Sequence, residues 1–578
     1  MVQVPDVPGI QPLRAAAARG VAGPRGGGRG RIRDDRRPGR PPEHGRIRQS
    51  HHCRARWTEV RVNRESFDPI KLEVSWNRLI SIASEQAAAM VNSSFSAVLG
   101  EMEDLSAGVF DSAGVMMAQS VQGAPGHLGS LSTGVKSFLE RYTAKDLAPG
   151  DVLITNDPWL VSGHKHDITV VTPVFLRKRL VGFAASNCHT VDIGGRIFSA
   201  GAAEVYEEGL QIPRMKLFEA GVRNATLFRI LEENVRSPEL VLGDLMAQVS
   251  ANETAARRLV DFMTGQKLDS LDSLSHNITS RTARLMREAI RRLPDGVYRD
   301  RGSLDGFDTP LEICVAVGIK GDTITVDFDG SSPQVPKGIN CVINFTEAFT
   351  RYALKCLLAP ESPNNDGSFA PIRVKAPEAS IVNARHPAPV DGRHLVGLYI
   401  PGILFGALAD VVPQRVLADS SVLSAVTLAG RDLRDKPYVF TFFSSGGMGG
   451  RNGKDGLDAT AFPSNVANVP VEVMEQATPV LVTRRELIAG SAGAGRYRGG
   501  AGQRIGVRLR GKHPATVSCM VERTQAAPRG LLGGGAGRAA GVLLDGKRID
   551  PKQAFQLEPG QELVLETPGG GGFGKEGG

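Results

Sequence analysis

Residues 151–195 read "DVLITNDPWLVSGHKHDITVVTPVFLRKRLVGFAASNCHTVDIGG". Three pieces of this stretch, "DVLITND", "ITVVTPVFL" and "RLVGFAAS", are rich in β-branched and apolar residues and predict strands. Two His-x-x-Asp pieces, His164 with Asp167 and His189 with Asp192, stand at strand ends or in loops. A chain with only 11 histidines uses this spacing twice, so the two pieces are candidates for one common site.

A metal centre is one interpretation of the two pieces. Imidazole and carboxylate ligands suit a borderline divalent ion such as Mn, Fe or Zn, and two histidines with one carboxylate leave positions open for water and substrate. Two strands that run side by side would bring His189 next to His164. The other interpretation is a pair of polar loops that hydrogen-bond to the backbone. Spacing alone leaves both open, and His166 competes with His164 as a ligand.

The sequence on either side predicts a mixed, α+β chain. Asp68 and Pro69 predict a helix start, as an N-cap followed by a helix-opening proline, and residues 106–120 predict a hairpin around Asp111. Residues 224–293 have the 3–4 spacing of helices, residues 297–330 return to strands, and further helices are expected at 345–358 and near 400–411. The expected regions are a disordered tail (1–58), an α/β region with the metal site (59–223), a helical and mixed α/β region (224–436) and a glycine-rich, all-β region (437–578).

The glycine clusters of the last region do not form a nucleotide site in our interpretation. "SSGGMGGRNGKDG" at 444–456 lacks the second glycine and the Ser or Thr of a phosphate loop. The other clusters lack the strand-before, helix-after setting of a dinucleotide fingerprint, so close-packed turns are the expectation. A Gly-x-Ser-x-Gly elbow is also missing, which argues against a serine hydrolase. His127, in "GAPGHLGS", is a loop histidine of the kind that is most often structural.

The net positive charge of the chain lies in its first 58 residues. Residues 1–58 contain 13 Arg and four acidic residues, and the remainder contains 56 basic and 57 acidic residues. The near-neutral remainder argues against nucleic-acid binding, and a membrane span is not expected without an apolar run of 18 residues. The first 58 residues cannot bury a core and are expected to be disordered. Our hypothesis is that translation starts near Val60 or Val62 and that the tail is upstream sequence translated in error.

The cysteines indicate a reducing compartment. Six cysteines lie scattered without Cys-x-x-Cys spacing, which argues against a disulfide framework and favours a cytoplasmic protein. Cys188 directly precedes His189, and it is either a buried thiol near the site or a nucleophile or ligand. The buried thiol is the favoured interpretation.

Taken in order, the motifs resemble those of the hydantoinase B/oxoprolinase family. They include "GDVLITNDPWLVSGHKHDITVVTPVF", "HTVDIGG", "EGLQIPRMKLFEAG", "DFDGSSPQVPKGIN" and "TPGGGGFG", and they extend from about residue 66 to 574. The resemblance implies that His164, Asp167 and His189 bind a divalent metal (Mn, Zn or Fe). It implies that Asp192 either orients a metal ligand or acts on the substrate. It implies that His166 does not bind the metal itself and is either packed behind the ligands or exposed.

The chain departs from the family pattern beside the expected ligands. The family typically shows Leu-Pro where this chain has Lys165 and His166, and a second His where it has Thr190. These departures are candidates for a changed substrate.

The resemblance also implies a division of labour. A partner of the hydantoinase A type binds ATP and phosphorylates the carbonyl oxygen of a lactam, imide or hydantoin. The present chain, in a hetero-oligomer with that partner, then completes ring opening with a metal-activated water and with His127 or Asp192 as general base. One alternative is a component of an ATP-driven carboxylase that acts on a ketone, as in acetone and acetophenone carboxylases. A second is a noncatalytic scaffold for the ATP-binding partner.

Overall fold

The computed structural model describes residues 67–127 and 129–577. The expected disordered tail and the hypothesis about its origin lie outside the described residues. The described residues belong to one compact unit. Within the part that is described, no helix is both long and apolar enough to cross a membrane.

A seven-stranded antiparallel sheet contains the strands predicted in residues 151–195. Its order is β2-β1-β5-β4-β3-β6-β7. The strands are β1 (Leu105–Asp111), β2 (Met116–Gln119), β3 (Val152–Thr155), β4 (Asp167–Leu176), β5 (Arg179–His189), β6 (Met215–Glu219) and β7 (Val222–Arg223). The hairpin predicted around Asp111 is confirmed as β1 and β2. Asp111 accepts hydrogen bonds from the backbone N–H groups of Ala113 and Val115 and so fixes the turn.

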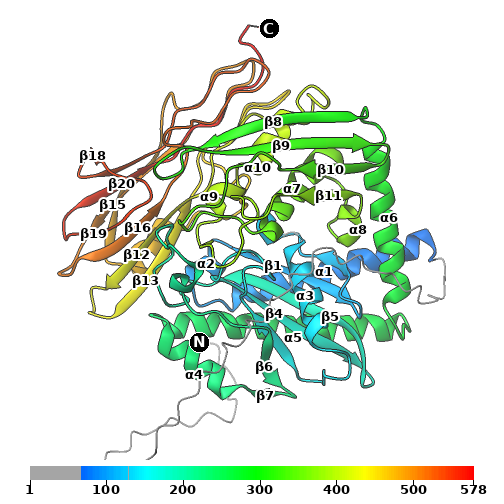
Figure 1. Cartoon of the computed structure of the whole chain (residues 1–578). Coiled ribbons are helices and arrows are strands. Elements are labelled where there is room, and N and C mark those ends of the chain that lie inside the picture. Colours follow the sequence, from blue (N-terminus) through cyan, green and yellow to red (C-terminus); the bar gives the residue numbers. More distant parts are fainter. Residues whose placement is uncertain (1–66, 128, 578) are drawn as a thin grey trace, which may run out of the picture. The chain divides into compact units, whose positions relative to one another are not determined.

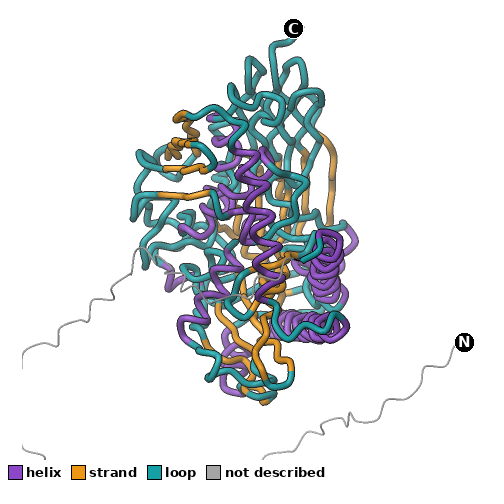
Figure 2. The backbone as a smooth tube through the Cα atoms, turned by 90° about the vertical axis from the view of Figure 1, so that its right-hand side faces the viewer, coloured by secondary structure: helices purple, strands orange, loops and turns teal. Residues whose placement is uncertain are grey.

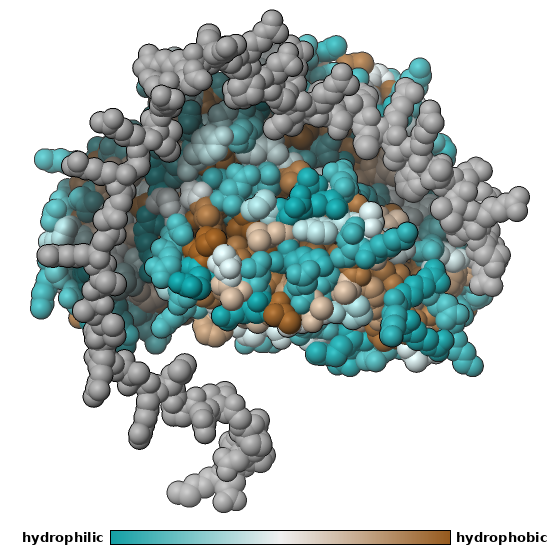
Figure 3. Space-filling model, turned by 60° about the horizontal axis from the view of Figure 1, so that its bottom comes forward, coloured by the Kyte–Doolittle hydropathy of each residue, from teal (hydrophilic) through white to brown (hydrophobic). Residues whose placement is uncertain are grey.

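Helices cover both faces of this sheet. On one face lie α1 (Pro69–Asn92), α4 (Ala225–Asn234), α5 (Pro238–Gly265) and α6 (Asp272–Ile290), and on the other lies α3 (Ser130–Arg141) (Figure 1). The predicted start of α1 is confirmed, because the Asp68 carboxylate accepts from the backbone N–H groups of Ile70 and Lys71. The region of the surface where α4 and α5 lie is a mixture of hydrophilic and smaller hydrophobic areas (Figure 3), as expected for helices whose apolar sides face a sheet.

The middle of the chain forms a second sheet with helices beside it. Its order is β11-β10-β9-β8, with β10 and β11 parallel and the other pairs antiparallel. The elements are β8 (Gly296–Leu304), β9 (Leu311–Lys320), β10 (Thr323–Asp327), β11 (Ile372–Lys375), α7 (Ile343–Leu358), α9 (His394–Gly397) and α10 (Ile400–Ala407). The helices predicted at 345–358 and near 400–411 are therefore confirmed as α7 and α10.

Two further sheets form the C-terminal part, in the orders β13-β12-β16-β19 and β14-β15-β20-β17-β18. Their strands are β12 (Ser424–Arg431), β13 (Pro437–Ser444), β14 (Val480–Leu487), β15 (Gln503–Leu509), β16 (Ala515–Met520), β17 (Gly541–Leu544), β18 (Lys547–Arg548), β19 (Ala554–Leu557) and β20 (Glu562–Glu566). The region expected to be all-β also contains one short helix, α11 (Val471–Ala477), which begins directly after Pro470. The boundary expected at residue 436 falls between β12 and β13, which pair along their full length; the division into regions stays a prediction.

The glycine clusters pack against each other as extended loops toward the C-terminal end (Figures 1 and 2). The backbone N–H of Gly500 donates to Met448 O, and that of Gly570 donates to Gly500 O. A Cβ atom added to Gly447 would lie 1.9 Å from the Gly500 carbonyl oxygen and 2.5 Å from the Gly570 nitrogen. Only glycine permits this approach, and the expectation of close-packed turns is confirmed here.

Candidate metal centre

Strands β4 and β5 place the two His-x-x-Asp pieces beside each other. Asp167, the first residue of β4, pairs with His189, the last residue of β5. Side chains alternate between the two faces of a strand. Asp167 and His189 therefore point to the face that α3 covers, together with Val171 and Phe183.

Cys188 lies on the opposite face of the same strand. It packs with Ala247 and Ala251 of α5, and burial raises the pKa of its thiol well above the ordinary value. The interpretation of Cys188 as a buried thiol is confirmed. The cysteines of the described residues are all free thiols.

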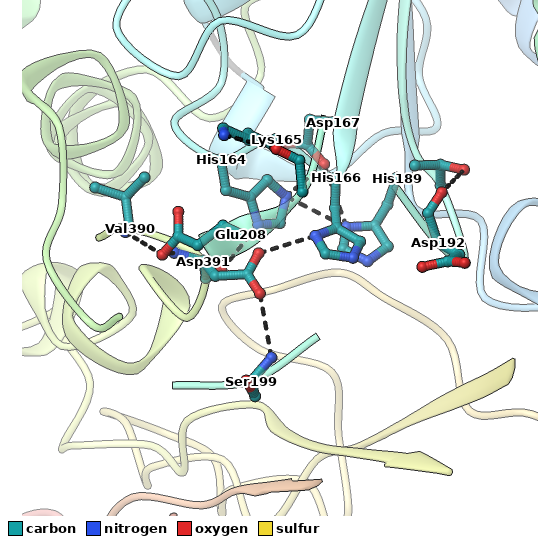
Figure 4. Close-up of polar contacts among 12 residues, drawn as sticks. His164, Lys165, His166, Asp167, His189, Asp192, Ser199, Glu208, Val390 and Asp391 are labelled. Carbon is teal, nitrogen blue, oxygen red and sulfur yellow. Dashed lines mark hydrogen bonds and ion pairs between the residues drawn. The ribbon is translucent and has the colours of Figure 1, made fainter. Parts of the chain in front are cut away.

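His164, Asp167 and His189 converge on one point (Figure 4). His164 Nε2 lies 2.7 Å from Asp167 Oδ1, and His189 Nδ1 lies 3.3 Å from each of these atoms. Ligand atoms that share a divalent ion with bonds of 2.0–2.2 Å are separated by about 3 Å. All three side chains are at most 2% exposed, so the donors are held in a protein interior and not on a mobile surface loop.

The protonation of His164 supports a cation among these atoms. Its Nδ1 lies 2.9 Å from the backbone oxygen of Asp391, and because a carbonyl only accepts, Nδ1 carries the hydrogen. Burial, together with the nearby Arg393, lowers the pKa of His164 to about 3, so the ring is neutral. Nε2 then directs a lone pair at a carboxylate oxygen, which is repulsive unless a cation lies between them. The residues present therefore fit a divalent metal, with His164 oriented by a backbone carbonyl as metal-binding histidines usually are.

The second oxygen of Asp167 is held by three neighbours. Ser162 Oγ donates to Oδ2 at 2.6 Å, Arg393 Nη2 donates at 2.6 Å, and His127 Nε2 lies at 3.1 Å. Burial opposes ionisation, but the charge of Arg393 and the hydrogen bond from His127 keep the pKa of Asp167 well below its ordinary value. The carboxylate is thus ionised and fixed, with Oδ1 left to face the two imidazoles.

The two residues predicted to be catalytic lie in different surroundings. His127, at the end of a short 3₁₀ turn, contacts Asp167 directly, and its Nδ1 is buried without a hydrogen-bond partner among the described residues. The Asp192 carboxylate instead accepts from the Gly194 backbone N–H and from the Arg236 guanidinium at 2.8 Å, and it lies behind His189 (Figure 4). Asp192 therefore holds the loop after β5. The catalytic roles of both residues stay predictions.

The residues that depart from the family pattern are buried beside the centre. Lys165 Nζ donates to the Gly209 carbonyl at 2.8 Å, and the Thr190 backbone N–H donates to His166 O at 2.7 Å. His166 is fully buried. Its Nδ1 lies 2.8 Å from Asp391 Oδ1, and its ring stacks on His189 with centroids 5.3 Å apart and planes 14° apart. Of the two alternatives for His166, a position behind the ligands agrees with this geometry.

Sequence reasoning missed the parts of the centre that come from elsewhere in the chain. Asp391, Arg393 and His394 come from the "DGRH" run at 391–394, and the Phe443 ring of β13 lies 5.9 Å from that of His189. The sequence contained one signal, a charged tetrapeptide between the apolar pieces "PAPV" and "LVGLYI". The centre thus combines residues from all three of the regions expected for the described part.

Asp104 is a further carboxylate at the centre that the sequence did not reveal. Its backbone oxygen accepts from the His189 N–H at 3.1 Å. Burial raises the pKa of its side chain, partly offset by the neighbouring His127 and His189. A carboxyl group in this position is a second candidate proton acceptor beside His127.

Comparison with known proteins gives consistent matches. The sequence profile described as Hydantoinase B/oxoprolinase matches residues 68–576. The B-type component of the "Putative D-/L-hydantoinase" of Pseudomonas sp. (strain NS671) is 32% identical over 466 residues, which cover 77% of this chain and 78% of that protein. The beta chain of the caprolactamase of Pseudomonas jessenii is 30% identical over 532 residues, which cover 88% of this chain and 91% of that protein.

Two solved structures share the fold. The crystal structure of the ATP-dependent caprolactamase from Pseudomonas jessenii superposes with a TM-score of 0.82 at 28% identity, over 88% of this chain and 92% of the matched chain. A nucleotide-free structure of acetone carboxylase superposes with a TM-score of 0.80 at 17% identity, over 88% and 76% of the two chains. The second match concerns the fold alone.

Proposed function

The chain belongs to the hydantoinase B/oxoprolinase family, and from this premise we propose that it is the metal-dependent, ring-opening component of an ATP-dependent cyclic amidohydrolase. The substrate is a lactam, imide or hydantoin whose carbonyl oxygen has been phosphorylated. The observation that supports this proposal most directly is the convergence of His164 Nε2, Asp167 Oδ1 and His189 Nδ1 within 3.3 Å of one another.

The metal is held by these three residues in the proposal. A divalent ion (Mn, Zn or Fe) bound there supplies Lewis acidity toward an oxygen of the reacting group. The chain's own contribution is to fix the donors. Asp391 O orients the His164 ring, and Ser162 and Arg393 hold the carboxylate of Asp167. The buried setting also strengthens each charge–dipole interaction with the developing negative charge.

In this proposal, either His127 or a nearby carboxylate accepts the proton. His127 touches Asp167 and keeps a buried Nδ1 that has no partner among the described residues, so it can take a proton from an attacking water. Asp104, whose pKa burial raises, is a second acceptor close to His127 and His189. Asp192 remains a candidate from the family resemblance, although its ion pair with Arg236 at 2.8 Å occupies its carboxylate.

In this proposal, a partner protein binds ATP and phosphorylates the substrate. Relatives are named as the B component of a hydantoinase and the beta component of a caprolactamase, and the glycine clusters of this chain form packed loops. We infer a hetero-oligomer with an ATP-binding partner of the hydantoinase A type. A cytoplasmic location agrees with the free thiols of the described residues.

Co-purification with an ATP-binding partner of the hydantoinase A type tests this function. The complex is assayed for ATP-dependent ring opening of hydantoin, 5-oxoproline and caprolactam, with product and ADP measured together. A His164→Ala complex is the matched control. The proposal predicts ring opening coupled to ADP release in the wild type, and ADP release without ring opening, or neither, in the variant. Equal ring opening by both complexes would support the scaffold role.

Carboxylation is the second candidate because the acetone carboxylase structure shares this fold. The same assay, run with a ketone and bicarbonate in place of the cyclic amide, separates the two. ATP-dependent fixation of labelled bicarbonate without ring opening would assign the chain to the carboxylases.

A further inference from the structure

The sheet β11-β10-β9-β8 has one covered face and one open face. Along β8, β9 and β10, residues that are more buried alternate with residues that are partly or fully exposed. The covered face packs against the core, where Gly302 of β8 lies against Ile403 of α10. A sheet with this alternation has its other face in contact with solvent. The alternate residues of the four strands therefore form one continuous surface, the open face.

The strand register arranges the open face as a floor between two basic edges. The edge strands contribute four exposed cations: Arg299 and Arg301 of β8, and Arg373 and Lys375 of β11. The central strands contribute a floor of mostly small residues: Cys314, Ala316, Gly318, Thr325 and Asp327. In the ladder, Arg299 is the partner of Ala316, and Arg373 is the partner of Thr325. The two basic edges are three strand spacings apart, which is about 14 Å.

The charge of the two edges is not neutralised within the described part of the chain. None of the four cations forms an ion pair or a side-chain hydrogen bond with another described residue. Arginines of the nearby helix α6 differ, since Arg287 and Arg291 both pair with Asp322, at 3.0 and 2.7 Å. Of the carboxylates on the open face, Asp327 accepts a backbone N–H of the turn after β10, and Glu312 lies near the start of β9. Unpaired charge of one sign favours a partner of the opposite sign.

The shape of the open face fits an α-helix. A helix with its side chains is about 10–12 Å across, so one helix fits between the two basic edges. Glycine weakens the interior of a strand and often marks a place where another backbone approaches closely. A Cβ atom added to Gly318 would make only an ordinary contact, 3.6 Å from the Thr325 carbonyl oxygen. The fold itself therefore does not require glycine at this position, whereas a closely packed partner would.

We propose that the open face is a docking surface for the ATP-binding partner, and that it receives one helix of that partner with Asp and Glu along both sides. The identity of the partner rests on the proposed function. The acidic sides of the helix pair with the edge cations of β8 and β11, while its backbone approaches Ala316 and Gly318 on the floor. The opposite charges also steer the two proteins together and raise the rate of association.

The test measures the affinity and the association rate of the full-length chain for a purified partner of the hydantoinase A type. Gly318→Tyr fills the floor without a change of charge, and it should weaken binding by about tenfold or more. Arg299→Glu combined with Arg373→Glu should weaken binding by about 100-fold or more and slow association.

A matched control changes the net charge by the same amount elsewhere. It combines Arg229→Glu with Lys145→Glu, two exposed residues on α4 and in the loop after α3. Helix α4 and strand β8 lie at opposite ends of the molecule (Figure 1), so the control should bind the partner like the wild type. Melting temperatures of all variants show whether each is folded, and the two kinds of change at the open face act independently.

The possible outcomes separate the docking surface from the proposed function. Unchanged binding in both open-face variants would overturn the inference, although ring opening by the complex would still support the function. A complex that both variants weaken, but that opens no cyclic amide, would support the inference and refute the reaction. An equal loss in the charge control would attribute the effect to net charge and overturn the inference. Self-association that Gly318→Tyr abolishes, with partner binding intact, would assign the open face to a second copy of the chain. A wild-type chain that forms no complex would refute both proposals.

Discussion

Asp167 and His189 are directly opposite each other in the β4–β5 ladder, and their side chains meet at 3.3 Å on the face of the sheet that α3 covers. The antiparallel register therefore brings together two residues that are 22 positions apart in sequence. His164 joins them from the loop that enters β4. A metal centre at this position depends on the register, because a one-residue slip would direct His189 to the opposite face.

Ser162 is predicted to tune metal affinity without binding the metal. Its hydroxyl donates to Asp167 Oδ2 at 2.6 Å. Ser162→Ala should weaken binding of Mn²⁺ or Zn²⁺ by roughly 10- to 100-fold, as loss of groups that orient metal ligands does. Titration with a competing chelator measures this. Ser518→Ala removes a buried hydroxyl that has no partner among the described residues and should leave the affinity unchanged. An equal loss in both variants would show a general effect on folding.

His127 and Asp192 are predicted to differ in their effects on turnover. His127→Gln should lower kcat by about 10²–10⁴ with the metal content retained, because a proton acceptor is lost. Asp192→Asn should chiefly lower the melting temperature, since it breaks the ion pair with Arg236. Steady-state kinetics and metal analysis of both variants check this. A His127→Gln complex with wild-type kcat would remove His127 from the mechanism.

Glu208 is predicted to reduce stability as the pH rises. Burial, and then the charge of Asp391, raise its pKa well above the ordinary value. The folded state therefore retains a proton that the unfolded chain has released. The contribution of Glu208 to the free energy of unfolding is complete below its pKa in the unfolded chain. As the pH rises from that value to the pKa in the folded state, the contribution is lost by as much as about 1.4 kcal/mol per pH unit. In Glu208→Gln, which keeps an acceptor for the Val390 and Asp391 N–H groups, this loss should disappear. Melting temperatures from pH 4 to 9 compare the two, and parallel curves would contradict the assignment.

The glycine loops are predicted to be intolerant of any side chain. Gly447→Ala should destabilise the protein by about 3 kcal/mol or more, because its Cβ would overlap the Gly500 backbone. Gly265, at the end of α5, has open space around a Cβ. Its change to Ala should be neutral or stabilising by up to about 1 kcal/mol. Chemical denaturation measures both, and similar behaviour of the two variants would refute the packing argument.

The elements that could be predicted from the sequence are those set by residues close together in the chain. Asp68 and Pro69 identified the start of α1, and the β-branched runs identified β3, β4 and β5, because these features act within a few residues. Helix α11 was missed because its seven residues lie between strands and are preceded by a proline. The pairing of β12 with β13 across residue 436 was also missed, since strand pairing is not visible in the composition of either segment.

The candidate site was predictable only in part, for a similar reason. The spacing of His164, Asp167 and His189 indicated candidate ligands, and the family resemblance selected among them. Asp391 and Arg393 lie more than 220 positions away in sequence, and only the tertiary fold brings them to the centre. His166 shows the converse case, in which a residue next to the ligands is directed away from them by a distant carboxylate.

Metal analysis of the natively purified complex tests the central claim most directly. The wild type and Cys188→Ala, whose side chain lies on the opposite face of β5, should each contain about one divalent ion per chain in the centre. Asp167→Asn and His189→Ala should lose it. A wild-type protein without stoichiometric metal, or an Asp167→Asn variant that keeps the wild-type amount, would contradict the account.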